Sequence, residues 1–304
     1  VAVRFKPGEY RIRETFALAA ADSGTEQAPV VYRAEKKGTA VFRGGARISG
    51  FAPVTDAGVL ARLPAESRGK VVQCDLKAQG VTDFGEIRAR GFGVAGDTIP
   101  TLELYADGVP LTPARWPNEG FVRIARLVEP GSRSPRKPSV FEYVDDRPAR
   151  WLQAKDAQLF GYFRWLWADG TVRVASIDPA AKRITTVEPY AYGGGGMDNG
   201  QGIRYYAFNL LEEIDRPGEW HLDRASGLLY LYPPADPART VFEIPLLPTP
   251  MVRLEGVSHV RFEGLDFDLG RHDAVVLKGC TRCLLAGCTI RRFAGGGVAI
   301  DGGT

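Results

Sequence analysis

Four aspartates near the end of the sequence are the side chains best placed for acid and base chemistry. Asp266 and Asp268 are two residues apart in an alternating segment, Asp273 follows His272 in the segment GRHDA, and Asp301 ends the segment VAID. Cleavage of a glycosidic bond needs two carboxyl groups about 5 Å apart for retention of configuration, or about 6.5 to 9.5 Å apart for inversion. We predict Asp273 and Asp301 as catalytic residues. We rank the other two lower, because almost any two strand carboxylates meet this spacing.

The predicted catalytic roles of Asp273 and Asp301 each have a structural alternative. Polar residues in a connection such as GRHDA commonly stabilise a turn, which is the alternative for Asp273. Asp301 is aligned with Glu255 and Lys278 at steps of 23 residues. This alignment fits a ladder of opposite charges on a solvated face, in which each pair contributes at most about 1 kcal/mol.

Candidate substrate-binding residues lie both in the middle of the chain and beside the GRHDA aspartate. Arg115, Trp116 and Asn118 place a cation, an aromatic plate and an amide within four residues. Tyr206 follows a glycine-rich run, and His272 lies within GRHDA. Aromatic faces and planar hydrogen-bonding groups are suited to holding sugars. We predict these five as substrate-binding residues, with a core position as the alternative for Trp116.

The cysteines are predicted to be structural. They are Cys74, Cys280, Cys283 and Cys288. The CxxC spacing leaves zinc and a disulfide as alternatives. However, the columns of the last three hold Val257, Val260 and Leu265 one repeat earlier. We therefore predict buried, reduced thiols, no metal site and no cofactor.

The segment 252–304 repeats with a step of 23 residues. Its aligned columns are Leu254/Leu277/Ile300, Gly256/Gly279/Gly302, Phe262/Leu285, Gly264/Gly287 and Phe267/Ile290. A fixed period with short alternating strands and glycine between them is typical of a solenoid. We predict a right-handed parallel β-helix with three strands in each rung, that is, each full turn of the solenoid.

Alternation within a rung predicts which side chains face the solenoid core. The predicted inward set is Val260, Phe262, Leu265 and Phe267, and the outward set is Arg261, Glu263, Asp266 and Asp268. Asp268 is aligned with Arg291, which suggests a second exposed charge ladder. The regular outer columns are better suited to an extended polymer than to a small metabolite.

The remaining chain is predicted to be all-β as well. Residues 1–50 contain the first rung or rungs, 51–245 form an inserted antiparallel β-sandwich, and 246–304 return to the β-helix. Three turns in the insert predict hairpins: Asp107-Gly108, Asp169-Gly170 and Ser226-Gly227.

Further expectations concern the aromatic residues and one short segment of the insert. All five tryptophans lie in the insert, and Trp165 and Trp167 are expected in the sandwich core. Asn209 and Glu212 have the spacing of a capping box, which predicts a short helix. The glycine run 192–202 is expected to form a loop.

Composition limits the function classes. The sequence is 44% hydrophobic and carries 39 basic against 36 acidic residues. This balance and the lack of basic runs argue against nucleic acid as a partner. No apolar run is long enough to span a membrane, and no signal peptide is recognisable. The sequence begins inside a predicted strand and ends at Thr304 within a rung, so we expect the natural protein to continue past Thr304.

Three stretches together resemble a known family. They are ARWPNEGF at 114–121, the segment 204–234 that begins RYYAFNLLEEID, and the segment 264–300 that begins GLDFDLGRHDA. The chain resembles bacterial right-handed β-helix glycoside hydrolases with an inserted β-sandwich, the group of α-L-fucosidases and xylanases that act on plant cell-wall polysaccharides. The resemblance implies a polysaccharide or oligosaccharide substrate, a secreted or periplasmic location, and catalytic carboxylates on rungs after Thr304.

The leading function hypothesis is therefore a glycoside hydrolase, or an N-terminal fragment whose full catalytic pair lies beyond Thr304. A polysaccharide lyase is one alternative, although no clustered carboxylates typical of a calcium site are visible. A non-catalytic glycan-binding or surface module is the other.

Overall fold

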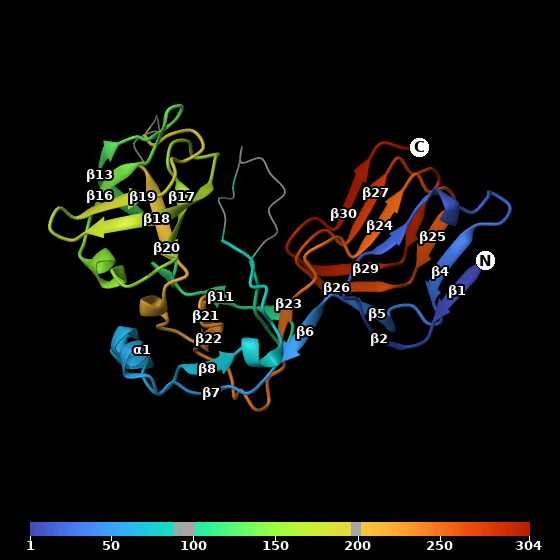
Figure 1. Ribbon diagram of the computed structural model, residues 1–304, viewed down its shortest axis with the longest axis horizontal. Coiled ribbons are helices and arrows are strands. Elements are labelled where there is room, and N and C mark those ends of the chain that lie inside the picture. The colour runs from blue at the N-terminus through green and yellow to red at the C-terminus, as the bar shows by residue number, and fades with distance from the viewer. Residues whose placement is uncertain (88–90, 92–100, 196–201) are drawn as a thin grey trace.

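The computed structural model describes residues 1–87, 91, 101–195 and 202–304. Figure 1 shows two parts side by side. One is a stack of parallel strands that contains both termini, and the other is an antiparallel insert. The predicted fold class, a parallel β-helix with an inserted antiparallel β-domain, is confirmed.

The β-helix has three parallel sheets of four strands each. The first sheet contains β1 (Ala2–Phe5), β4 (Val30–Ala34), β25 (Val260–Glu263) and β28 (Leu284–Ala286). The second contains β2 (Gly8–Arg11), β5 (Ala40–Arg43), β26 (Asp266–Gly270) and β29 (Thr289–Phe293). The third contains β3 (Phe16–Leu18), β24 (Val252–Glu255), β27 (Val275–Lys278) and β30 (Val298–Asp301).

The 23-residue register is confirmed strand by strand. Leu254 lies opposite Leu277, and Leu277 lies opposite Ile300. The backbone repeats as well as the side chains. The glycines that follow these strands have a left-handed φ: Gly256 (+63°), Gly279 (+58°) and Gly302 (+64°).

The solenoid core consists of the inward residues predicted from alternation. Val260, Phe262, Leu265 and Phe267 are at most 1% exposed. Phe262 stacks on Tyr32 of the preceding rung, with the ring centroids 5.2 Å apart. Contacts of this kind join each rung to the next, because a single rung cannot bury its own apolar face.

The insert interrupts a rung rather than following one. Residues 1–44, within the region predicted to hold the first rung or rungs, contain five strands, β1 to β5, and the sixth strand needed to complete two rungs is β24. At the exit point a Cβ on Gly45 would collide with the backbone oxygen of Ile244 and the side chain of Leu269. Glycine is therefore required where the chain leaves the solenoid.

The insert contains two sheets and a barrel. The smaller contains β6 (Gly45–Ile48), β9 (Tyr105–Ala106), β10 (Val109–Pro110) and β23 (Phe242–Pro245). The larger contains β7 (Ala52–Pro53), β8 (Val72–Asp75), β11 (Thr112–Pro113), β21 (Glu219–Asp223) and β22 (Leu228–Leu231). The helix α1 (Ala57–Arg62) connects β7 to the segment before β8.

The rest of the insert is a barrel. Its strands are β12 (Arg115–Trp116), β13 (Val122–Glu129), β16 (Val140–Tyr143), β17 (Gln158–Tyr162), β18 (Gly170–Asp178), β19 (Arg183–Thr186) and β20 (Arg204–Phe208). Pairing of β20 with both β13 and β17 closes the sheet on itself, with β12 attached outside the ring. The short strands β14 (Ser132–Arg133) and β15 (Arg136–Lys137) form a separate hairpin.

Several expectations for the insert are corrected. The segment 204–208 is the strand β20, and only a 3-10 turn, Leu211–Glu213, follows it. Asn209 adopts φ +60° and donates from Nδ2 to the Asp156 carbonyl, so it caps no helix. Trp165 and Trp167 lie in the connection between β17 and β18, outside the barrel core, and Trp167 is 60% exposed. Residues 196–201 of the glycine run lie outside the described residues.

A buried charge network joins the insert to the β-helix. Asp268 on β26 is fully buried, and its carboxylate lies 2.6 Å from Arg292 and 3.4 Å from Arg43. Glu243 on β23 binds the same two arginines. An exposed ladder at Asp268 was therefore the wrong expectation, because a strand of the insert covers this part of the solenoid.

Among the described residues, no helix is long and apolar enough to cross a membrane.

Candidate functional site

The outer surface of the barrel carries a group of aromatic side chains. In β20, Tyr205 and Ala207 face the barrel core, so the residues between and beside them face outward. The neighbouring strand β17 contributes two further rings in register with β20. We call the following set the aromatic face: Phe121, Phe160, Tyr162, Tyr206 and Phe208.

The rings of the aromatic face contact one another. The Tyr206 centroid is 5.1 Å from that of Phe160, 5.6 Å from that of Phe121 and 5.9 Å from that of Phe208. Phe121 is 38% exposed, and the other rings are half-buried. The set is therefore a continuous, partly accessible aromatic surface, formed by two adjacent strands and by Phe121, which directly precedes β13.

Arg115 completes this surface. Its guanidinium carbon lies 3.5 Å from the centroid of the Tyr206 ring. Two of its donors are fixed by the carbonyl oxygens of Pro117 and Gly120, at 2.8 and 2.6 Å. Burial lowers the pKa of Arg115 and raises the pKa of Tyr206. The two predicted residues thus form one planar, partly desolvated cation–aromatic pair.

Trp116 and Asn118, predicted with Arg115, have other partners. Trp116 packs against the barrel core, with its ring centroid 5.8 Å from that of Trp151. Asn118 donates from Nδ2 to Asp215 at 2.7 Å. Its Oδ1 is buried and has no hydrogen-bond donor within the described ranges. The structure therefore brings together Arg115 and Tyr206, but not the full predicted set.

His272 and Asp273 lie in the turn between β26 and β27. Asp273 accepts a hydrogen bond at Oδ1 from the backbone N–H of Gly296 in the next rung. His272 Nδ1 accepts from the Asp273 N–H at 2.7 Å. The adjacent Arg271 is fully buried and lies 2.8 Å from Asp83 of the insert. This turn therefore lies at the junction of the two parts, and the Asp273 carboxylate contacts the next turn of the solenoid.

Asp301 lies at the opposite end of its strand. It is exposed and in register with Lys278, five residues after Asp273 along the adjoining strand. At about 3.3 Å per residue this places the α-carbons of Asp273 and Asp301 roughly 16 Å apart. The distance exceeds the range for a glycosidase acid–base pair, so Asp273 and Asp301 do not form one pair with each other.

Thr304, the residue after which we expected the catalytic pair, takes no part in the candidate site. It is exposed, and its backbone joins the last rung to the one before. The Thr304 N–H donates to the Cys280 carbonyl at 3.0 Å, and the Thr304 carbonyl accepts from the Arg282 N–H at 2.8 Å. Because the pair was expected on rungs after Thr304, its position stays a prediction.

The connection after β17 carries a second aromatic group. Trp165 and Trp167 stack with ring planes 11° apart and centroids 6.2 Å apart. Tyr192 meets Trp167 nearly edge-on, with the centroids 5.9 Å apart. Sequence reasoning missed the exposure of Trp167 and, apart from Tyr206, the outward rings of the aromatic face. The alternation in RYYAF and QLFGY was the available signal for the latter.

A small cavity of about 170 Å³ lies between α1, the segment before β17, and the β21–β22 hairpin. His221 lines it and stacks against Tyr230. Burial, together with the charges of Arg62 and Arg224, lowers the pKa of His221 to about 3. Its Nδ1 is buried without a hydrogen-bond partner within the described residues. His221 is consequently neutral and too weakly basic for proton transfer near pH 7.

Comparison of the sequence with family models and with curated proteins gives no match. Among solved structures, one described as "Glycoside hydrolase" is similar over 98% of this chain and 60% of its own length, with a TM-score of 0.66 and 17% identity. A second, "The complex structure of XylC with xylose", covers 92% of this chain and 34% of its own, with a TM-score of 0.37 and 10% identity. The second likeness is too low to support an argument. The first supports the fold.

Proposed function

We propose that the chain is the polysaccharide-binding part of a β-helix glycoside hydrolase. The observation that carries this proposal is the aromatic face with Arg115 stacked on Tyr206. A partly exposed aromatic patch is a common mark of a binding surface. The similar structure described as a glycoside hydrolase supports the reaction class. The chain spans only 60% of that structure. Hydrolytic activity of this chain is therefore proposed here and does not follow from the similarity.

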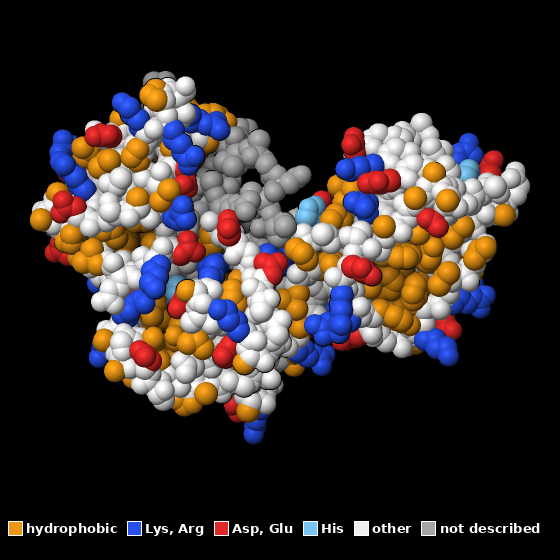
Figure 2. Space-filling model, viewed as in Figure 1, with side chains coloured by type: hydrophobic (Ala, Val, Ile, Leu, Met, Phe, Trp, Pro, Cys, Tyr) orange, Lys and Arg blue, Asp and Glu red, His pale blue; other side chains and the backbone are white. Residues whose placement is uncertain are grey.

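The aromatic face has the properties that a sugar surface requires. Sugar rings have an apolar C–H face and a rim of hydroxyl groups. The rings of Tyr206 and Phe121 would stack on the former, and the Arg115 guanidinium and the Tyr206 hydroxyl would bind the latter. Most of these side chains stand on β-strands, and strands hold a site more rigidly than loops do. Figure 2 shows a notch between the insert and the β-helix on this face of the molecule.

Hydrolysis requires a carboxyl pair. Asp273 is the better candidate of the two predicted residues, because its turn contacts the insert through Arg271 and Asp83. Since Asp301 is too distant to serve as its partner, we propose that the second carboxyl group belongs to a rung after Thr304. The non-catalytic glycan-binding module remains the second candidate function, because the Asp273 carboxylate has a structural partner in the Gly296 N–H.

A location outside the cytoplasm is part of the same proposal. A polysaccharide of the kind proposed is encountered outside the cytoplasm, so we propose a secreted or periplasmic protein.

The test is binding and hydrolysis with xylan, pectic side chains and aryl α-L-fucosides. Binding is measured by retardation in gels that contain each polysaccharide, and hydrolysis by release of reducing ends or aryl groups. We expect at least one polysaccharide to bind, and Tyr206→Ala and Phe121→Ala to weaken binding about tenfold or more. Trp167→Ala removes an exposed ring outside the aromatic face and Leu152→Ala an exposed aliphatic one, so both serve as controls. Equal losses in all four variants, or no binding to any glycan, would contradict the proposal.

A further inference from the structure

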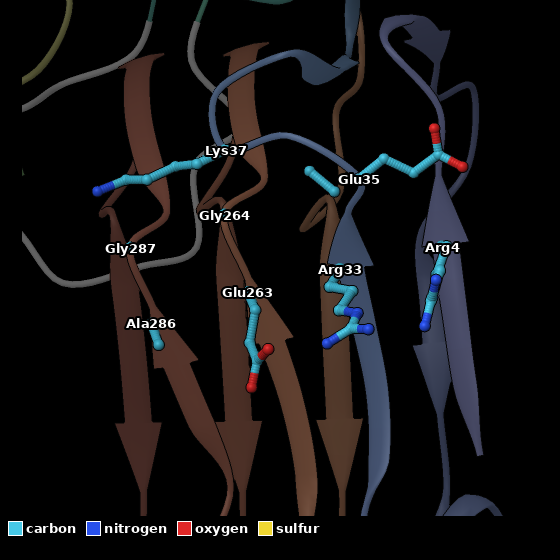
Figure 3. Close-up of a pocket in the computed structure, with 9 residues that line it drawn as sticks. Arg4, Arg33, Glu35, Lys37, Glu263, Gly264, Ala286 and Gly287 are labelled. Atoms are coloured by element: carbon cyan, nitrogen blue, oxygen red, sulfur yellow. The ribbon is translucent and has the colours of Figure 1, made fainter.

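A groove of about 680 Å³ crosses the outside of the first β-helix sheet. This volume falls in the usual range for ligand sites. Figure 3 shows its lining residues on strands and turns of four successive rungs. They are Arg4, Arg33, Ala34, Glu35, Lys37, Glu263, Gly264, Ala286 and Gly287.

The floor of the groove is a single row of outward side chains. Arg4 lies opposite Arg33, Arg33 lies opposite Glu263, and Glu263 lies opposite Ala286. Neighbouring strands are about 4.8 Å apart, so the row is about 14 Å long. Figure 3 shows the four residues side by side on parallel strands. The small Ala286 side chain leaves the end of the row open.

Arg4 and Arg33 form a like-charge pair in direct register. Like charges opposite each other on neighbouring strands destabilise a sheet. In the described part of the chain neither guanidinium makes a hydrogen bond or salt bridge, although Glu263 is the next residue in the row. An anion bound across both arginines would remove this repulsion.

Lys37 supplies a third cation at the edge of the groove. Its side chain extends over two turn glycines, as Figure 3 shows. A Cβ on Gly264 would lie 3.3 Å from the Lys37 Cα, and one on Gly287 would lie 3.3 Å from its Cε. Both glycines have a left-handed φ, +66° and +61°. The repeated glycine thus leaves room for the lysine stem to cross two rungs.

In the second sheet of the β-helix, three arginines have carboxylate partners within the protein. On β5, Arg43 lies within salt-bridge distance of Glu9, Glu243 and Asp268. On β29, Arg291 and Arg292 both contact Asp268. These three arginines are balanced by carboxylates of the protein, whereas Arg4, Arg33 and Lys37 have no such partners among the described residues.

We propose that this groove binds an acidic glycan, a polysaccharide that carries carboxylate groups. The proposal rests on the proposed carbohydrate function and adds a second site with its own ligand class. Carboxylates of the glycan lie over Arg4 and Arg33 and near Lys37, where planar guanidinium groups can form paired hydrogen bonds. Glu263 accepts hydrogen bonds from sugar hydroxyl groups farther along the row.

The composition of the groove favours a glycan over a nucleic acid. Glu35 and Glu263 lie within it and would repel a continuous phosphate backbone. Its lining contains no aromatic residue on which a base could stack. An acidic polysaccharide can have uncharged positions between its carboxylates, so these positions can lie beside Glu35 and Glu263 without repulsion. Its binding also does not require an aromatic residue for base stacking.

The experiment compares polygalacturonate with its methyl ester, which has the same backbone without the charge, by isothermal titration calorimetry. We expect polygalacturonate to bind, the ester to bind at least tenfold more weakly, and added salt to weaken the binding of polygalacturonate. Arg4→Gln combined with Arg33→Gln should lower the affinity for polygalacturonate at least tenfold. Arg239→Gln, which changes an 88% exposed arginine in the insert, should leave it unchanged.

Several results would overturn the inference. These are equal binding of acid and ester, binding unaffected by the double substitution, or equally tight binding of single-stranded DNA at the same residues. Removal of a like-charge pair should not lower the melting temperature, so loss of binding through unfolding is detectable. If these variants have no effect while Tyr206→Ala still weakens the binding of a neutral glycan, the groove proposal fails and the proposed function stands.

Discussion

The guanidinium carbon of Arg115 lies 3.5 Å from the centroid of the Tyr206 ring. The two residues come from different strands, β12 and β20, and are 91 positions apart in the sequence, yet their interaction orients the centre of the aromatic face. Because an arginine on an aromatic ring contributes about 0.5 to 2 kcal/mol, this contact is large enough to measure.

We predict a coupling free energy of about 0.5 to 2 kcal/mol between these residues in a double-mutant cycle of Arg115→Ala and Tyr206→Ala. The measurement is the free energy of unfolding in urea for the wild type, both single variants and the double variant. Arg115→Lys keeps the charge but loses the planar fork, so it should recover only part of the coupling. Strictly additive single effects would contradict the assigned contact.

The second prediction concerns the buried network at the junction of the two parts. Asp268→Asn removes the carboxylate shared by Arg43 and Arg292 and should lower the free energy of unfolding by about 3 to 5 kcal/mol. Burial by itself raises the pKa of Asp268, but the hydrogen bonds and charges of Arg292 and Arg291 outweigh it, so the pKa is lowered. The ionised Asp268 carboxylate therefore contributes to the free energy of unfolding above the pKa that Asp268 has in the unfolded state. This contribution is lost as the pH falls through the pKa of Asp268 in the folded state.

Asp301→Asn is the matched control, since Asp301 is an exposed carboxylate of the same solenoid. It should change the free energy of unfolding by less than about 0.5 kcal/mol. Similar values for the two variants would mean that Asp268 is not buried in the network described above.

The third prediction is a pair of opposite pH dependences. His221, with a pKa of about 3 when folded and 6.5 as the reference value, is neutral in the folded state while the unfolded state takes up a proton. The free energy of unfolding therefore decreases as the pH falls from 6.5 toward 3, and His221 accounts for at most about 1.4 kcal/mol of this decrease per pH unit. His221→Phe should flatten this loss.

Glu219 acts in the other direction. It is 1% exposed, and burial raises its pKa from 4.5 to about 7. Its folded state holds a proton that the unfolded state releases, so stability falls as the pH rises from 4.5 to about 7. Glu219→Gln should remove this fall. Because the two effects oppose each other between pH 4.5 and 6.5, urea unfolding of both variants across pH is needed, and two identical profiles would refute the assignment.

The fourth prediction concerns Cys283 and Cys288 on the last rung. Both are free and half-buried, and burial raises the pKa of each thiol. Exchange of either for valine should change the free energy of unfolding by less than about 1.5 kcal/mol, because both occupy apolar columns. Stoichiometric zinc in the purified protein, or a large loss of stability in either variant, would show that the thiols have another role.

The β-helix could be predicted from the sequence because its contacts repeat at a fixed interval. The 23-residue spacing alone predicts that Leu254, Leu277 and Ile300 lie side by side on neighbouring strands. Alternation along a strand then distinguishes inward Phe262 from outward Glu263. The burial of Asp268 could not be predicted in this way. It depends on Glu243 of the insert, which the local pattern around Asp268 does not contain.

The insert was harder to predict because its pairings are long-range and irregular. Hairpin signals correctly placed the turns at Asp107-Gly108 and Ser226-Gly227. The closure of the barrel depends on β17 pairing with β20, two strands more than forty residues apart. The alternation in RYYAF indicates that Tyr205 and Tyr206 face opposite sides of the strand, but without that pairing it does not indicate which side is the barrel core. The exposure of Trp167 could not be derived from its spacing either.

The most direct test of the central claim is a crystal structure with an oligosaccharide of whichever glycan binds most tightly in the gel assay. We predict a sugar ring stacked on Tyr206 and Phe121, with ring atoms within about 4.5 Å of their faces and a hydroxyl group bound to Arg115. A well-ordered sugar bound only at Trp165 and Trp167, with none on the aromatic face, would contradict the account.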